Sequence, residues 1–191
     1  MSKSNFADTI IGKLRESIGT DGQGYSTECA STAMQAVADG ITEYLTANTR
    51  VTVSYNGIIP GAPPQTDPVK ADTFKIVGSC APTGPSDNFD AWIRLIEGNI
   101  IAGFTLAPKG EKGVSFPAAP FLIPGIATVR DSLYSIHNAN ENDPQHLVWE
   151  AICQGIIDWI EGVAANTNPG PASRASAPST GTAIITGIKI Q

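Results

Sequence analysis

Hydrophobic residues recur at helical spacing in four parts of the chain, and this pattern predicts four helices. Within each part, apolar residues lie three or four positions apart, as in a helix that buries one face. The first helix stops at a glycine-rich run, and the last begins at Asp143-Pro144, a capping carboxylate followed by a proline in the first turn. The predicted ranges are 6–18, 27–46, 89–103 and 144–162, with a short additional helix over 130–137.

Alternation of apolar and polar residues predicts two strands in the first half of the chain. Val51–Tyr55 alternates as a half-buried strand does, and Asn56-Gly57 after it is typical of a hairpin turn. Prolines cannot donate to a central ladder, so the proline-rich segment that follows is expected to be a loop. This loop leads to a second predicted strand over Thr73–Val77. We therefore expect an α+β fold, with about four helices packed on a small, mostly antiparallel sheet in one domain over residues 1–163.

The C-terminal part of the chain has a different composition. Residues 164–181 are rich in Pro, Ser and Ala and predict a flexible linker. Residues 182–191 then predict a tethered strand with four residues on one face: Ile184, Thr186, Ile188 and Ile190. A lone strand is unstable, so its backbone needs a sheet edge. That edge can belong to the same chain or to a neighbouring subunit, and the sequence leaves both alternatives open.

An irregular apolar segment lies between the third and fourth predicted helices. Its prolines exclude a helix and a central strand. The segment either crosses the protein's own core or forms a contact surface for another subunit. Together with the four residues of the C-terminal strand, it supplies the candidate assembly interface through four large apolar side chains: Phe116, Phe121, Leu122 and Ile123.

Composition and charge narrow the classes of function. The formal net charge is −6 and the basic residues are scattered, which disfavours direct binding to nucleic acid. Cys29, Cys80 and Cys153 form neither a disulfide framework nor a metal-binding CxxC pair, so we expect reduced, buried thiols and synthesis in a cytoplasm. Neither a signal peptide nor a membrane-spanning segment is predicted.

Residues able to carry chemistry do not form a known catalytic pattern. His137 and His146 are the only histidines, and neither stands in a metal-binding or nucleophile motif. The three tryptophans lie at helical positions, where core packing competes with a role as a ligand or carbohydrate platform: Trp92, Trp149 and Trp159. We therefore expect a non-enzymatic protein without a cofactor or a metal.

The layout of the chain resembles small virion proteins of tailed bacteriophages, of the tail, baseplate or capsid-decoration type. The resemblance rests on the short N-terminal helix, the Val51–Pro64 segment, the apolar helices that begin at Phe89 and Asp143, and the C-terminal Pro/Ser segment that ends in a strand. It implies a structural subunit of a virion, made in the host cytoplasm, that assembles with copies of itself and with other virion proteins and exchanges its C-terminal strand. Alternatives are a capsid cement or neck protein, a small-ligand or carbohydrate-binding module, and an enzyme of unrecognised type.

Overall fold

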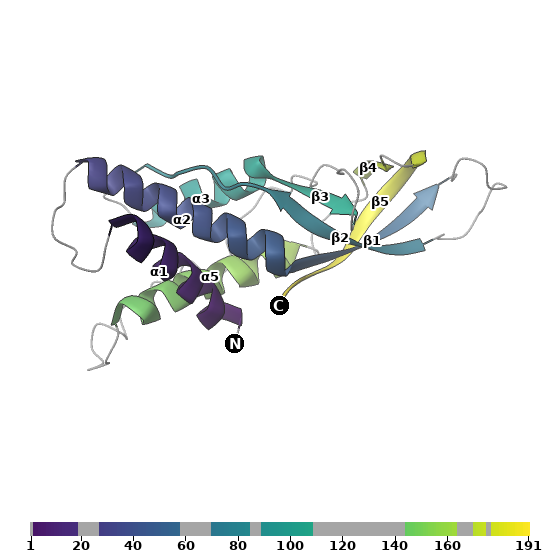
Figure 1. Ribbon diagram of the computed structural model, residues 1–191. Coiled ribbons are helices and arrows are strands. Elements are labelled where there is room, and N and C mark those ends of the chain that lie inside the picture. The colour runs from purple at the N-terminus through teal and green to yellow at the C-terminus, as the bar shows by residue number, and fades with distance from the viewer. Residues whose placement is uncertain are drawn as a thin grey trace.

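The helices and strands of the computed structural model confirm the predicted α+β fold (Figure 1). The structure describes residues 2–18, 27–57, 70–84, 89–108, 144–163, 170–174 and 177–191. Its helices are α1 (Ser2–Ile18), α2 (Thr27–Asn48), α3 (Phe89–Gly103) and α5 (Pro144–Val163). Its strands are β1 (Thr49–Gly57), β2 (Lys70–Gly78), β3 (Phe104–Pro108), β4 (Gly170–Arg174) and β5 (Ala177–Ile190). The short helix predicted over 130–137 lies outside the described residues.

Helices α1 and α2 pack closely because a glycine lies at their contact. Phe6 of α1 stacks on Tyr44 of α2, with ring centroids 4.4 Å apart. Further along, Ile10 of α1 lies against Gly40 of α2, where an added Cβ would stand 2.9 Å from the Ile10 Cα. Residue numbers rise along one helix as they fall along the other, so the two helices are antiparallel. The glycine inside α2 lowers helix propensity, and this close approach explains its presence.

The five strands form one antiparallel sheet in the order β3-β2-β1-β5-β4. Strand β1 follows α2 directly, pairs with β2 on one side, and pairs with β5 on the other. The C-terminal strand is therefore docked on its own chain, in the interior of the sheet. Of the two alternatives that the sequence left open, the structure has the intramolecular one.

The prediction of a flexible linker over 164–181 is wrong where β4 and the first part of β5 lie. These segments pair with each other as an antiparallel hairpin, with Ala172 opposite Gly181. Small residues and prolines dominate them, so no apolar alternation identified them as strands. Pro171 is tolerated because β4 is an edge strand, where a missing N–H need not break a ladder.

A β-bulge changes which face of β5 is buried. Val53 lies opposite Ile185 and Thr52 lies opposite Gly187, so Thr186 is an extra residue between the two pairs. The side-chain alternation therefore shifts by one position at Thr186. Ile185 and Ile188 are both buried, whereas Thr186 is exposed. The predicted shared face for Ile184, Thr186, Ile188 and Ile190 is wrong for this reason.

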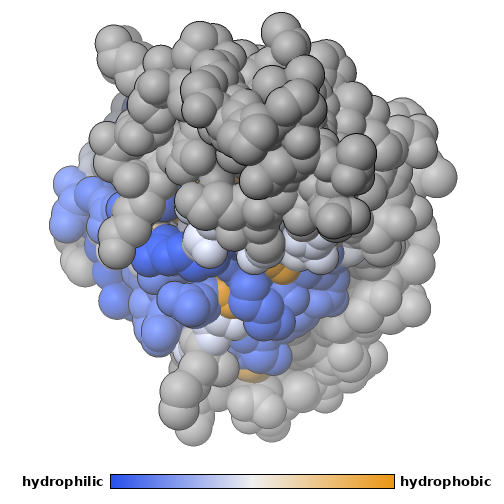
Figure 2. Space-filling view, turned by 90° about the vertical axis from the view of Figure 1, so that its right-hand side faces the viewer, coloured by the Kyte–Doolittle hydropathy of each residue, from blue (hydrophilic) through white to orange (hydrophobic). Residues whose placement is uncertain are grey.

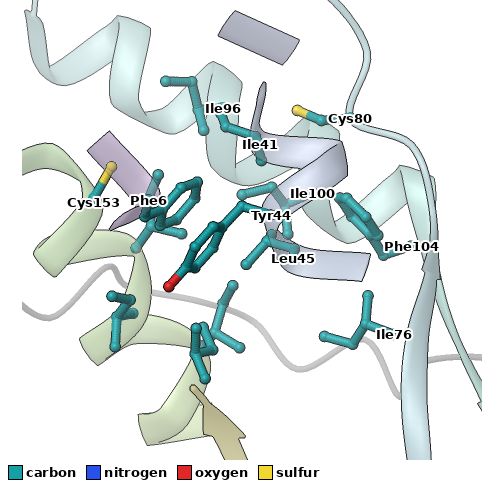
Figure 3. Close-up of a cluster of buried hydrophobic side chains, with 14 of the residues drawn as sticks. Phe6, Ile41, Tyr44, Leu45, Ile76, Cys80, Ile96, Ile100, Phe104 and Cys153 are labelled. Atoms are coloured by element: carbon teal, nitrogen blue, oxygen red, sulfur yellow. The ribbon is translucent and has the colours of Figure 1, made fainter. Parts of the chain in front are cut away.

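The core lies where the helices meet the inner face of the sheet (Figure 3). In the close-up, Tyr44 and Phe6 lie between α5 and the end of α2, and Ile76 of β2 faces Phe104 and Leu45. Phe6, Leu45 and Phe74 are fully buried, and α3 contributes Ile96. Because these side chains come from distant parts of the sequence, helices and sheet form a common hydrophobic core.

The molecule is elongated, with helices toward one end and the sheet toward the other (Figure 1). Helices α1, α2 and α5 gather at the first end. Strands β1, β2 and β5 run away from them, and their far ends project beyond the described helices. The chain therefore has a helical end and a sheet end.

Candidate functional site

The structure divides the eight predicted interface residues into three groups. Four lie outside the described residues: Phe116, Phe121, Leu122 and Ile123. In β5, Ile188 and Ile190 are buried in the protein's own core, and Thr186 is exposed and donates to the Thr52 carbonyl at 3.2 Å. For Ile184 only the backbone is described, opposite Ser54. Burial of the two isoleucines means that they hold β5 in place within the chain.

Hydrogen bonds from two helices hold the end of β5. The Glu161 carboxylate of α5 accepts the Ile190 backbone N–H at 2.9 Å and pairs with Lys189 at 2.9 Å. The Tyr44 hydroxyl of α2 lies 2.9 Å from the Gln191 carbonyl and 2.9 Å from the Ser2 carbonyl, so its one proton is shared between them. Glu161 thus satisfies a backbone donor at a point where β5 pairs with β1 alone.

A row of three basic residues crosses the solvent-facing side of the sheet, and sequence reasoning missed it. Arg50 of β1 lies directly opposite Lys75 of β2 on one side and opposite Lys189 of β5 on the other. Directly opposite residues share a face, and their Cα atoms are about 4.5–5.5 Å apart. We call Lys75, Arg50 and Lys189 the basic row. Each of these residues occupies a polar position in the alternation of its own strand. Only the register between the strands places the three residues side by side.

The basic row contains more positive charge than its described neighbours neutralise. Lys189 pairs with Glu161, and Arg50 donates to the Ala47 and Thr49 carbonyls at 2.9 Å. Neither Arg50 nor Lys75 forms an ion pair with another described residue. Like charges directly opposite each other destabilise a sheet, so the row opposes the stability of the fold that displays it.

An excess of carboxylates lies on the α1–α2 surface. Glu16, Asp39 and Glu43 are exposed, and we call them the acidic cluster. Lys13 lies 2.9 Å from Glu43 and 3.9 Å from Glu16. The hydrogen bond to Glu43 raises the pKa of Lys13, as do the charges of Glu43, Glu16 and Asp39. One lysine is thus shared by three carboxylates.

His146 belongs to a group of charged residues between α1 and α5. Its Nε2 lies 3.1 Å from Asp8 and its Nδ1 lies 4.0 Å from Glu150, which is also 3.8 Å from Lys3. These contacts join two helices at the surface, a structural role typical of such pairs. The other histidine, His137, lies outside the described residues.

The two described thiols are poorly suited to nucleophilic chemistry. Burial raises the pKa of Cys80 to about 11, and burial also raises the pKa of Cys153 well above its ordinary value. Because the thiolate is the reactive form, both remain protonated near neutral pH. Glu97 of α3 is a buried carboxylate whose pKa is raised by burial, while the charge of Arg94 lowers it. Among the described residues, no second carboxylate acts on it as an acid/base partner would.

The tryptophans differ in exposure. Trp159 is buried in the core, as packing at a helical position predicts. Trp92 and Trp149 are half-buried and meet edge to face, with ring centroids 6.1 Å apart. The Trp92 indole N–H donates to the Thr83 hydroxyl at 3.1 Å. These contacts join α3 to α5 through aromatic packing.

The described residues offer neither a metal-binding cluster nor a membrane-spanning helix. They contain no group of three or more His, Cys, Asp or Glu side chains arranged to hold a metal ion. In the same part of the chain, no helix is both long enough and apolar enough to cross a membrane.

Comparisons with known proteins found no match for this chain among protein-family models, curated proteins or solved structures. The structure itself defines the class, which is an α+β protein with an all-antiparallel sheet and an internal C-terminal strand.

Proposed function

We propose that this protein is a non-enzymatic structural subunit of an assembled particle. The observation that carries the proposal is the sheet that projects beyond the described helices (Figure 1). A sheet with two edges, here β3 and β4, can pair with an added strand of a neighbouring chain. Its layout, similar to that of small virion proteins, makes a tailed-bacteriophage virion the proposed particle, with the subunit in the tail or baseplate.

In this proposal, strand exchange moves a hairpin and not a single strand. Strand β4 pairs with β5 and with no other described strand, so it would travel with β5 to a neighbour. The exchanged hairpin would leave the Glu161 and Tyr44 contacts of its own chain and form the equivalent contacts in the neighbour. The surfaces buried inside one chain then become contacts between subunits, as in domain swapping.

Cysteine cross-linking tests the exchange. Asn56 and Thr182 are paired across β1 and β5, so Asn56→Cys with Thr182→Cys places two thiols opposite each other. The isolated chain should form an intrachain disulfide, and the assembled particle should yield interchain dimers on a non-reducing gel. Single-cysteine variants are the controls. Only intrachain disulfides in assembled particles would eliminate exchange while leaving the structural role intact.

The composition of purified particles tests the function itself. Virions released by the cells that make this protein should contain it in many copies, measured by quantitative mass spectrometry after density-gradient purification. Its absence from intact particles would contradict the proposal. Dissociating the particles into heads and tails then separates a tail or baseplate location from the alternative of a capsid cement or neck protein.

A further inference from the structure

Charge is divided between the two kinds of secondary structure in this protein. The four described helices contain four basic and ten acidic residues, a formal net charge of −6. The five strands contain five basic residues and one acidic residue, a formal net charge of +4. The scattered basic residues of the sequence thus concentrate on the sheet once the chain folds.

Within the described residues, no ion pair joins the basic row to the acidic cluster. Lys75 and Arg50 form no ion pair with a described carboxylate, and the three carboxylates of the acidic cluster share Lys13. The two complementary surfaces lie on different elements and do not pair with each other within the chain, so both are available to a second molecule. Seen from the sheet end (Figure 2), the described surface is mainly hydrophilic with small hydrophobic areas.

We propose that the basic row is a docking surface for a second copy of this chain, which presents its acidic cluster of α1 and α2. The proposal rests on the assembly function above and names the partner and the surface. Because the two surfaces differ, the contact is heterologous, so repetition generates a ring if the rotation closes and a filament if it does not. The carboxylates of the partner would also offset the repulsion within the basic row.

Charge reversal tests the contact. A sheet variant combines Arg50→Glu with Lys75→Glu, and a helix variant combines Asp39→Lys with Glu43→Lys. Each should weaken self-association by about tenfold or more, since like charges then face each other. The two variants mixed together should associate again, because each supplies the surface that complements the other. Arg94→Glu on α3 reverses one basic charge at an exposed position that belongs to neither surface, and it should leave association unchanged.

Sedimentation velocity over a range of protein concentrations measures association, and circular dichroism confirms that each variant folds. Raising the ionic strength from about 0.1 M to about 1 M shortens the Debye length from about 10 Å to about 3 Å, so association of the unmodified chain should weaken strongly. This salt test and the helix variant remain decisive if the sheet variant does not fold.

Several results would overturn the inference. The first is that the chain stays monomeric at low salt. The second is that self-association is unaffected by salt and by both charge-reversal variants. The third is that the two variants do not associate when they are mixed. Tight binding of a labelled oligonucleotide, abolished by the sheet variant while self-association is absent, would identify a nucleic-acid surface instead. None of these results decides whether the chain is present in particles, which mass spectrometry measures separately.

Discussion

Replacing Gly40 by alanine should destabilise the protein, although alanine is the better helix former. In an open helix the exchange stabilises by about 1 kcal/mol. At Gly40, however, the new Cβ would lie 2.9 Å from the Ile10 Cα and 3.0 Å from the Ile10 Cγ1. Carbon atoms pack at about 3.5–4.0 Å, so α1 must move away by about half an ångström to one ångström. Such overpacking costs about 1–3 kcal/mol, and the expected net effect is a loss of about 1 kcal/mol.

Gly12→Ala is the matched control, because it changes the same residue type within α1, where an added Cβ has nothing within 4 Å. It should stabilise the protein by about 0.5–1 kcal/mol. Urea unfolding followed by circular dichroism measures both variants, and opposite signs of the change in unfolding free energy are expected. If Gly40→Ala matched or exceeded the stability of the unmodified chain, the close α1–α2 contact would be wrong.

Three further changes test other parts of the fold. Thr49→Val should stabilise by about 1 kcal/mol in urea unfolding, since the Thr49 hydroxyl is buried without a described hydrogen-bond partner; a loss would indicate a partner. Tyr44→Phe should cost about 1 kcal/mol, because the hydroxyl that bonds Ser2 and Gln191 is removed; no loss would argue against that contact. Cys80 has a folded pKa of about 11 against 9.0 for the free thiol, so the unfolded chain loses its proton first. Stability should therefore fall between about pH 9 and pH 11, and Cys80→Ala should remove that part of the decrease.

The helices could be predicted from the sequence because their signals are local. Apolar spacing identified α1, α2, α3 and α5 with ends close to those observed, and the Asp143-Pro144 cap located the start of α5. The strands β1 and β2 were also predicted in outline, since each alternates over several residues. Each was longer than predicted because pairing in the sheet continues through residues that carry no apolar pattern.

The arrangement of the sheet could not be predicted because it depends on distant residues. Strand β3 (Phe104–Pro108) follows α3 without a break, and its short apolar run was not predicted as a strand. The bulge at Thr186 arises in the pairing of β5 with β1, which lies far away in the sequence. The position of β5 between β1 and β4 depends likewise on contacts between the two halves of the chain.

The basic row links the register of the sheet to the proposed contact between copies of the chain. Natural sequences tend to agree with their fold at every level, and violations concentrate at functional sites. The polar face of this sheet could hold threonine or residues of opposite charge at the same positions, and exposed threonines at 52 and 73 form the next cross-strand pair. Instead, three cations occupy adjacent strands in a chain of net charge −6. The proposed docking of a second, carboxylate-bearing copy would account for that exception, because the repulsion that opposes folding in a single chain would become attraction between two copies.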